Sequence, residues 1–194
     1  MGLVKTAALV AVILGLSVCV RGAAPSIGAP APDFALTTLD GKPFSLAEAA
    51  RSRQAIVLMF IATKCPYSNA YNARMREMAA VYGAKGVLFA GINSNKSEPA
   101  DEARAHAKEH GHTFPIMKDP DNKVADLYDA KRTPEIFVVD REGKLRYHGR
   151  IDENYENPSQ VASPDLKNAL DAILDGKAVE KAETKAFGCT IKRV

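Results

Sequence analysis

Cys65 has the neighbours expected of a reactive thiol. It follows the apolar run of residues 55–62, AIVLMFIA, and is itself followed by Pro66. An apolar run of this length, rich in branched side chains, predicts a strand that is buried on both faces. Cys65 should then lie where this strand gives way to a helix. Free backbone N–H groups at such a junction stabilise the thiolate, the nucleophilic form of cysteine, whereas the alternative is an inert, half-buried thiol.

The segment after Cys65 supports this position. Residues 66–82 predict a helix, because large side chains repeat at helical spacing and Gly83 can end it. The repeating side chains are Tyr71, Met75, Met78 and Tyr82. A proline suits the first turn of a helix, where its missing N–H costs nothing. Two neighbours should lower the thiol pKa further: Lys64 through its charge, and Ser68, one helical turn away, through a hydrogen bond from its hydroxyl.

The rest of the chain predicts alternating strands and helices that would hold this junction in place. Asp40-Gly41 lies between two apolar segments and predicts an N-terminal hairpin. A Ser-Pro-Asp sequence at 163–165 should cap an amphipathic final helix that Gly176 ends. The other expected elements are a strand at 87–93, helices at 98–110 and 122–128, a short strand or extended segment at 114–117, and a hairpin formed by 136–139 and 145–148. This order predicts an α/β fold whose central sheet is mixed in direction and covered by helices on both faces.

These motifs resemble those of the thioredoxin superfamily, and more closely those of its alkyl hydroperoxide reductase/thiol-specific antioxidant (redoxin) branch. Residues 65–68, Cys-Pro-Tyr-Ser, are similar to the dithiol motif Cys-Pro-x-Cys with serine at the second cysteine. Thr133-Pro134 resembles the cis-proline loop that faces the active cysteine in that superfamily. Residues 65–74 and the stretch Gly-Ile-Asn-Ser-Asn at 91–95 are closer still to a subgroup of peroxiredoxin-like proteins.

The resemblance covers roughly residues 28–152, with a weaker similarity at 188–192. It implies a thioredoxin fold, with a central mixed β-sheet flanked by helices and an N-terminal β-hairpin extension. It also implies that Cys65 acts as the nucleophile toward protein or small-molecule disulfides or peroxides, that a partner dithiol protein supplies the electrons, and that no tightly bound cofactor takes part. The implied substrate-binding residues are Pro66, Tyr67, Thr133 and Pro134, with Lys64, Tyr71, Arg74 and Arg132 in support.

Cys189 is the second cysteine of the expected mature chain, because Cys19 lies in the N-terminal apolar segment. About 14 residues separate Cys189 from the final helix, and fully extended they span about 46 Å, which exceeds the diameter of a domain of this size. Cys189 can therefore reach Cys65, and two cysteines of an exported chain can pair. Three roles are open for Cys189: resolving a mixed disulfide on Cys65, forming a structural disulfide, or pairing with another chain.

The residues around Cys65 depart from the peroxiredoxin pattern. Peroxiredoxins carry a threonine or serine three residues before the cysteine and a proline further back, where this chain has Ala62 and Leu58. The later peroxiredoxin arginine is also missing from its place, and Arg74 and Arg132 are the candidates to replace it. These departures favour thiol–disulfide chemistry over peroxidase activity. The competing class is a non-enzymatic binding module that keeps the fold and a structural disulfide.

The N-terminus predicts export. Lys5 precedes an uninterrupted apolar stretch at 7–20, and small residues follow it, which is the pattern of a secretory signal over residues 1–24. The apolar stretch is shorter than the roughly 20 residues of a membrane span, although an uncleaved anchor is an alternative. The expected organisation is a signal peptide, a redoxin domain at 25–176 and a flexible C-terminal tail at 177–194. The mature protein should be periplasmic or secreted, with membrane contact only through the signal.

Charge and histidine spacing indicate neither a nucleic-acid partner nor a metal. The net charge is +3, falling to about +1 without the signal, and there is no basic stripe with interleaved aromatic residues. His106 and His110 lie one helical turn apart, a spacing that can suit a metal ion. No cysteine or acidic residue obviously completes such a site, so we expect a solvated helix face there.

Overall fold

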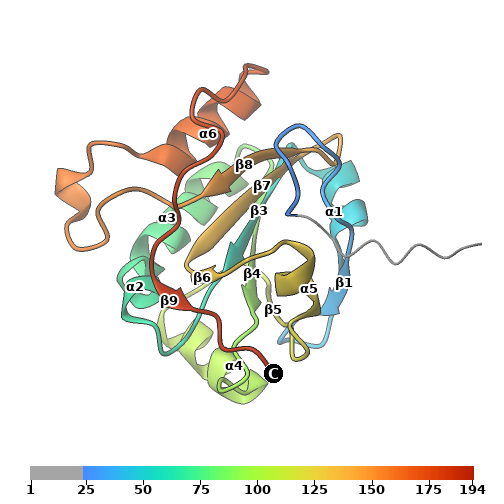
Figure 1. Ribbon diagram of the computed structural model, residues 1–194, viewed down its shortest axis with the longest axis vertical. Helices are drawn as coiled ribbons and strands as arrows, with labels where there is room; N and C mark the ends of the chain where they lie inside the picture. Colours follow the sequence, from blue (N-terminus) through green and yellow to red (C-terminus); the bar gives the residue numbers. More distant parts are fainter. Residues whose placement is uncertain (1–23) are drawn as a thin grey trace, which may run out of the picture.

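The computed structural model describes residues 24–194, which form a central five-stranded sheet with helices on both faces (Figure 1). The strand order is β5 (Ile116–Lys118), β4 (Val87–Asn93), β3 (Ala55–Phe60), β7 (Glu135–Asp140) and β8 (Leu145–Gly149). β4 runs parallel to β3 and to β5, whereas β7 is antiparallel to both β3 and β8. The predicted mixed sheet is therefore confirmed. The expected signal lies outside the described residues except for its last residue.

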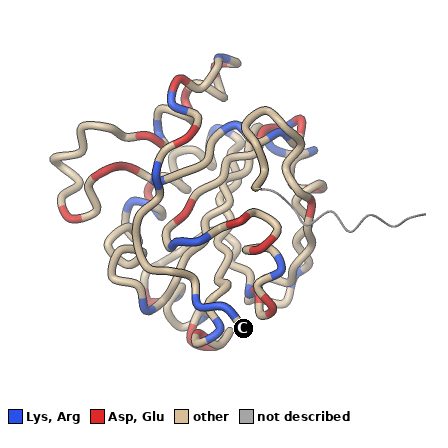
Figure 2. The backbone as a smooth tube through the Cα atoms, viewed as in Figure 1, with Lys and Arg blue, Asp and Glu red and all other residues tan. Residues whose placement is uncertain are grey.

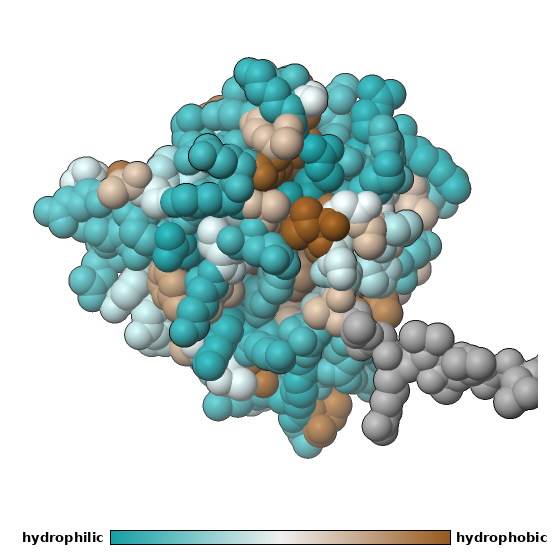
Figure 3. Space-filling model, turned by 45° about the horizontal axis from the view of Figure 1, so that its top comes forward, coloured by the Kyte–Doolittle hydropathy of each residue, from teal (hydrophilic) through white to brown (hydrophobic). Residues whose placement is uncertain are grey.

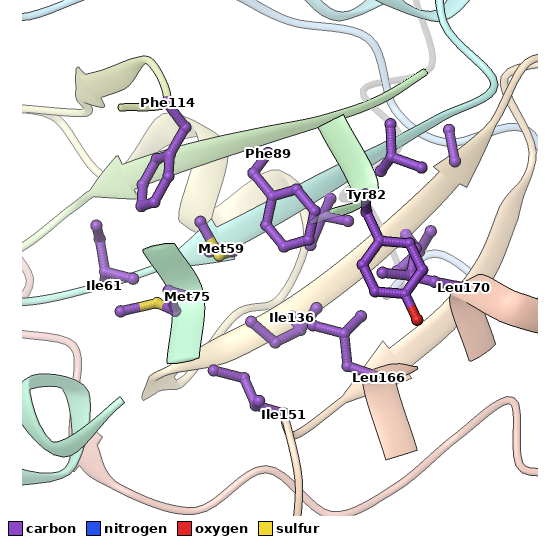
Figure 4. Close-up of a cluster of buried hydrophobic side chains, with 14 of the residues drawn as sticks. Met59, Ile61, Met75, Tyr82, Phe89, Phe114, Ile136, Ile151, Leu166 and Leu170 are labelled. Carbon is purple, nitrogen blue, oxygen red and sulfur yellow. The ribbon is translucent and has the colours of Figure 1, made fainter. Parts of the chain in front are cut away.

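β3 is the middle strand because both of its faces are apolar. Every one of its side chains is buried, as the uninterrupted run predicted. Ala55, Val57 and Met59 belong to the hydrophobic cluster on one face, and the alternate residues belong to the cluster on the other. Figure 4 shows the first cluster, in which Met59 and Phe89 of the sheet meet side chains from two covering helices.

The helices divide between the two faces. α3 (Asn72–Gly83), α4 (Ala100–Glu109) and α6 (Asp165–Leu174) bury residues in the first cluster, whereas α1 (Leu46–Ser52) and α5 (Lys123–Leu127) bury residues in the second. A short 3₁₀ helix, η1 (Pro158–Gln160), lies in the long loop before α6. α1 was not predicted, although Ser45 accepts a hydrogen bond from Glu48 N at its start. The expected cap of α6 is wrong: Pro164 occupies its N-cap and supplies no side-chain hydrogen bond.

The single helix expected at 66–82 is wrong, because two helices meet at Tyr71. α2 (Pro66–Ala70) ends there and α3 begins one residue later. The Tyr71 N–H bonds to the carbonyl of Ser68, three residues back, at 3.1 Å, which closes a tighter turn than an α-helix has. The Tyr71 hydroxyl is held at the same time by the carboxylate of Asp152, at 2.8 Å. A tertiary contact therefore coincides with the break between the two helices.

Two small sheets flank the central one. The predicted N-terminal hairpin is confirmed as β1 (Ala35–Thr37) paired antiparallel with β2 (Pro43–Ser45). The other sheet joins β6 (Arg132–Thr133) with β9 (Cys189–Thr190), which belongs to the C-terminal tail. Figure 1 shows the tail leaving α6, passing α3 and α2, and ending beyond β9. On the way it bonds to β8 through Thr184 N and the carbonyl of His148, at 2.9 Å.

The surface carries both signs of charge. Figure 2 shows basic and acidic residues interspersed along the backbone, and the face seen in Figure 3 is mainly hydrophilic with small, separated hydrophobic patches. Among residues 24–194, no helix combines the length and apolar character needed to span a bilayer.

Candidate active site

Cys65 lies at the junction that the sequence predicted, as the N-cap residue of α2 and directly after the loop that leaves β3. It is only 2% exposed. Its Sγ accepts a hydrogen bond from Ser68 N at 3.4 Å and donates one to the carbonyl oxygen of Thr133 at 3.1 Å. A helix N-terminus and a distant loop therefore both contact the sulfur. The first contact favours the thiolate, because the N–H can donate to a negative sulfur.

Ser68 acts on the thiol through its backbone, which corrects the expectation for its side chain. The Ser68 hydroxyl oxygen accepts a hydrogen bond from Ala62 N at 3.2 Å, and the residue is buried. The hydroxyl thus joins the end of the β3 segment to α2. The predicted role of this hydroxyl as a donor to Cys65 gives way to a role in holding the loop between Ala62 and Ser68.

Lys64 is directed away from the sulfur. Its Nζ forms an ion pair with Glu102 at 2.8 Å and donates to the carbonyl of Ser97 at 3.1 Å, and its side chain is 57% exposed. An exposed pair of this kind contributes little to stability. The cation expected to assist Cys65 instead links the loop before Cys65 to α4.

The C-terminal tail brings Cys189 to Cys65. β9 pairs with β6 in a register that sets Cys189 opposite Thr133 and Thr190 opposite Arg132. This pairing sets Cys189 next to Cys65, because the carbonyl oxygen of Thr133 also accepts a hydrogen bond from Cys65 Sγ. Both cysteines are free thiols. The tail, expected to be flexible, is docked in this structure, and its release remains a prediction.

The two thiols have opposite pKa shifts. Burial alone would raise the pKa of Cys65, but the neighbouring Cys189 and the N–H of Ser68 outweigh it and hold that pKa below the ordinary value of a thiol. Burial, together with the hydrogen bond and negative charge of Cys65, raises the pKa of Cys189 to about 11. Cys65 is therefore the thiol that ionises first, and Cys189 is held protonated beside it.

The Thr133-Pro134 loop lies against Cys65, as the resemblance implied, and its peptide bond is cis. Thr133 is 1% exposed, and its hydroxyl has no hydrogen-bond partner within the described residues. The backbone of Thr133, expected to pair with a substrate peptide, is paired here with the tail. The tail therefore occupies the edge at which substrate binding was predicted.

Pro66 and Tyr67 lie at the outer side of Cys65. Pro66 is exposed in the first turn of α2. The Tyr67 ring lies 4.5 Å from the Tyr155 ring and 6.1 Å from the Phe187 ring, measured between centroids. This aromatic cluster joins α2, the loop before α6 and the tail two residues before Cys189.

Three of the four predicted supporting residues, Tyr71, Arg74 and Arg132, make contacts around the site. Tyr71 and Arg74 both bind Asp152, and Arg74 Nη1 reaches that carboxylate at 2.6 Å. Arg74 also donates to the carbonyl of Tyr155 at 2.7 Å, which holds the loop that carries the aromatic cluster. Arg132 donates to the Thr190 hydroxyl at 2.9 Å and so binds the tail.

Glu98 was missed by the sequence analysis. It is 2% exposed and accepts hydrogen bonds from Thr63 N at 2.9 Å and Lys64 N at 3.0 Å, in the loop directly before Cys65. The signal available in the sequence was its position after the Gly-Ile-Asn-Ser-Asn stretch at 91–95, which is part of the resemblance.

The histidines in and just after α4 make local contacts. His106 Nε2 lies 2.8 Å from Asn69 Oδ1, and the His112 ring stacks on Phe114 at 4.8 Å between centroids. Burial lowers the pKa of His112 to about 4, with help from the charges of His106 and His110. Across the described part of the chain, no three histidine, cysteine, aspartate or glutamate side chains group so that they could hold a metal ion.

Comparisons with known proteins match this chain and its fold. The AhpC/TSA family model matches residues 27–148. The thiol-disulfide oxidoreductase ResA of Geobacillus thermodenitrificans (strain NG80-2) is 29% identical over 123 residues, which are 63% of this chain and 68% of that protein.

Two solved structures share the fold. A hypothetical protein from Sinorhizobium meliloti 1021 has a TM-score of 0.80 at 34% identity, covering 89% of this chain and 97% of that one. A putative thiol:disulfide interchange protein DsbE from Chlorobium tepidum has a TM-score of 0.65 at 26% identity, covering 78% of this chain and 99% of that one. The chain described here belongs to the AhpC/TSA family and has the thioredoxin fold.

Proposed function

We propose that this protein is a thiol–disulfide oxidoreductase in which Cys65 is the nucleophile and Cys189 the resolving thiol. The observation that carries the proposal is the position of Cys189, which pairs with Thr133 while the Thr133 carbonyl accepts a hydrogen bond from Cys65 Sγ. In this position the two thiols shift each other's pKa in opposite directions. The name of the related protein from Geobacillus thermodenitrificans, thiol-disulfide oxidoreductase, supports the same class of reaction.

The reaction would proceed by two exchanges. The Cys65 thiolate attacks one sulfur of the substrate disulfide, forming a mixed disulfide and releasing the other substrate sulfur as a thiolate. The Cys189 thiolate then attacks Cys65 Sγ, which forms the Cys65–Cys189 disulfide and releases the second substrate thiolate. Solvent supplies the protons to the products and accepts the proton of Cys189. A partner dithiol protein returns two electrons and two protons to the pair, and no bound cofactor is required.

The shifts in pKa set the order of the two exchanges. Two of the causes that raise the pKa of Cys189 are the hydrogen bond and the charge of Cys65. Both causes end when Cys65 enters a mixed disulfide, because its sulfur no longer carries a negative charge. The pKa of Cys189 should therefore fall after the first exchange, so that the resolving thiol ionises only when there is a mixed disulfide to resolve.

The tail limits which substrates reach Cys65. Because β9 occupies the Thr133 edge, a protein substrate that binds as an extended strand must displace Cys189 and Thr190. Residues 177–194 thus act as a tail that alternates between docked and released states. Pro66, Tyr67, Thr133 and Pro134 would form the substrate-binding surface when the tail is released.

Peroxide reduction is less well supported by the residues around the sulfur. The Thr63 hydroxyl donates to Glu102, and the two candidate arginines bind Asp152 and Thr190. These side chains are therefore engaged elsewhere, whereas a peroxidase needs such groups to position the peroxide.

Intact mass after oxidation separates the possible functions. The reduced protein is treated in parallel with a protein disulfide and with hydrogen peroxide, and Cys65→Ser and Cys189→Ser are carried as controls. An oxidoreductase loses two hydrogen atoms faster with the protein disulfide, and neither variant forms the intramolecular bond. Faster oxidation by peroxide would instead favour a peroxidase, and no reaction with either oxidant would favour a binding module.

We further propose that the chain is exported and that the mature protein starts between Ala23 and Pro25. The basis is the signal-like pattern of residues 1–24. N-terminal sequencing of protein from the extracytoplasmic fraction tests this, and a start at Met1 or Gly2 would contradict it.

A further inference from the structure

Glu98 is a buried carboxylate, and each of its two oxygens accepts two hydrogen bonds. Oε2 accepts from Thr63 N at 2.9 Å and from Asn93 Nδ2 at 2.6 Å. Oε1 accepts from Lys64 N at 3.0 Å and from Asn95 Nδ2 at 3.1 Å. The two backbone donors belong to the loop that immediately precedes Cys65, so this carboxylate fixes the peptide planes from which α2 begins.

Asn95 continues the same network into the C-terminal tail. Its Oδ1 accepts a hydrogen bond from Lys192 N at 2.7 Å, and the neighbouring Lys96 N donates to the Lys192 carbonyl at 2.8 Å. Lys192 lies three residues after Cys189. A continuous polar path therefore runs from Lys64 N through Glu98 and Asn95 to Lys192 N, and it links the segments that carry the two cysteines.

Lys118 joins the same network through two hydrogen bonds from its ammonium group. Its Nζ donates to Asn93 Oδ1 at 2.7 Å and to the Asn95 carbonyl at 2.6 Å. The first bond holds the Asn93 amide group toward Glu98, and the second holds the backbone of Asn95. The Asn95 amide group is oriented instead by Lys192 N, which donates to its Oδ1.

We infer that Glu98 and Asn95 are positioning residues that hold the Cys65 loop and the Cys189 tail in register, so that the two sulfurs meet. This inference rests on the proposed function. The stretch of residues 91–95, to which the sequence analysis assigned no role, would thus connect the segments that carry the two cysteines. Neither residue contacts a sulfur, and their effect is exerted through the backbone of Thr63, Lys64 and Lys192.

The chemistry requires a carboxylate at position 98. All four partners of Glu98 are donors, and a carboxylate is an acceptor at both oxygens. In Glu98→Gln, the amide nitrogen would face two of these donors, which removes two hydrogen bonds although the side chain keeps its size. Asn95→Ala removes the hydrogen bond that Asn95 accepts from Lys192 N and the one that it donates to Glu98. The hydrogen bonds that Thr63 N and Lys64 N donate to Glu98 remain.

The experiment measures the equilibrium between the reduced pair and the Cys65–Cys189 disulfide in glutathione buffers. Forming the disulfide removes two electrons and two protons from the pair, and one oxidised glutathione takes them up to give two reduced glutathione molecules. Samples are quenched in acid, alkylated and weighed by mass spectrometry, and the thermal midpoint of each protein is measured as well. Misplacement of a reacting group by about 1 Å can cost about 100-fold in effective concentration. We therefore expect the equilibrium constant for forming the disulfide to fall at least tenfold in both Glu98→Gln and Asn95→Ala.

Asp140→Asn is the matched control. Asp140 is also buried and accepts two backbone hydrogen bonds, from Glu142 N and Lys144 N, both at 2.9 Å. It lies at the end of β7 opposite Ala55, and thus at the other end of β3 from the Cys65 loop. We expect Asp140→Asn to lower the thermal midpoint and to leave the disulfide equilibrium of the wild type unchanged.

Two results would overturn the inference, and they are distinguishable. If Glu98→Gln and Asn95→Ala lower the thermal midpoint but keep the wild-type disulfide equilibrium, the network is only structural, while the proposed function stands. If the wild type forms no Cys65–Cys189 disulfide at any buffer composition, both the inference and the proposed function are wrong. If Glu98→Gln does not fold, Asn95→Ala decides between these outcomes.

Discussion

Gly188 packs directly against the carbonyl group of Thr133. A Cβ atom at position 188 would lie 2.1 Å from the Thr133 oxygen and 2.9 Å from its carbonyl carbon. The backbone of Gly188 also has φ of +136°, which residues with a side chain rarely adopt. The next residue, Cys189, pairs with Thr133 in the β6–β9 ladder. Glycine at position 188 is therefore what lets the tail come close enough for the two thiols to meet.

Gly188→Ala should separate the thiols without altering either one. The added methyl group must push the tail away from the Thr133 backbone, which cannot yield as a flexible side chain would. We expect the effective concentration of Cys189 at Cys65 to fall about tenfold or more, measured as the ratio of disulfide to dithiol in glutathione buffers. Gly176→Ala is the control, because Gly176 also has positive φ but nothing lies within 4 Å of its added Cβ. Equal effects of the two substitutions would mean that backbone strain, and not the contact with Thr133, is responsible.

Alkylation should label the two cysteines in a fixed order as pH rises. Only the thiolate reacts, so the rate for each thiol increases with pH until the pH passes its pKa. Since the pKa of Cys65 is lowered, its rate should level off at a lower pH than that of a cysteine in an unfolded peptide. The rate of Cys189 should keep rising toward its pKa of about 11. Peptide mass mapping after timed alkylation measures the rate for each cysteine. Burial slows the alkylation of Cys65 at every pH, so the comparison uses only the pH midpoint of each profile.

The same measurement on Cys65→Ser tests the coupling. Without a thiolate at position 65, the pKa of Cys189 should move back toward the ordinary value of a thiol. An unchanged pH profile of Cys189 in this variant would show that burial alone raises its pKa.

Cys189→Ser should separate a resolving role from a structural one. If Cys189 resolves, the variant accumulates Cys65 as a mixed disulfide or a sulfenic acid, and turnover slows. If the Cys65–Cys189 bond is only structural, the oxidised variant loses about 4 kcal/mol of stability and turns over at the wild-type rate. Single-turnover mass spectrometry and denaturant unfolding of the oxidised proteins measure the two quantities independently.

Arg74→Ala should destabilise the protein and leave the thiols unchanged. Asp152 is buried, and losing its partner leaves a buried carboxylate without a cation, which costs about 3 kcal/mol. The pH midpoint of Cys65 alkylation should stay at its wild-type value, because the hydrogen bonds of the Cys65 sulfur go to Ser68 and Thr133 and not to Arg74. Lys167→Ala is a suitable comparison, since its pair with Asp171 is exposed and worth less than about 1 kcal/mol. A shifted Cys65 midpoint in Arg74→Ala would place Arg74 among the groups that act on the thiol.

The sequence by itself determined the features that depend on neighbouring residues. The apolar run at 55–62 requires a strand buried on both faces, Pro66 suits the first turn of a helix, and Asp40-Gly41 favours a turn. Each of these follows from the conformational preference or burial of a few adjacent side chains. They were sufficient to predict the N-terminal hairpin, the mixed sheet and the position of Cys65 between a strand and a helix.

Only the tertiary structure decided what surrounds the sulfur. Thr133 is 68 residues from Cys65 along the chain, and no local pattern records which donors meet there. The Ser68 hydroxyl bonds to Ala62 N, and Lys64 pairs with Glu102, because nearer partners compete for these side chains. Glu98 could not be assigned for the same reason: its role comes from four donors that converge only after β3, β4 and α4 have packed together.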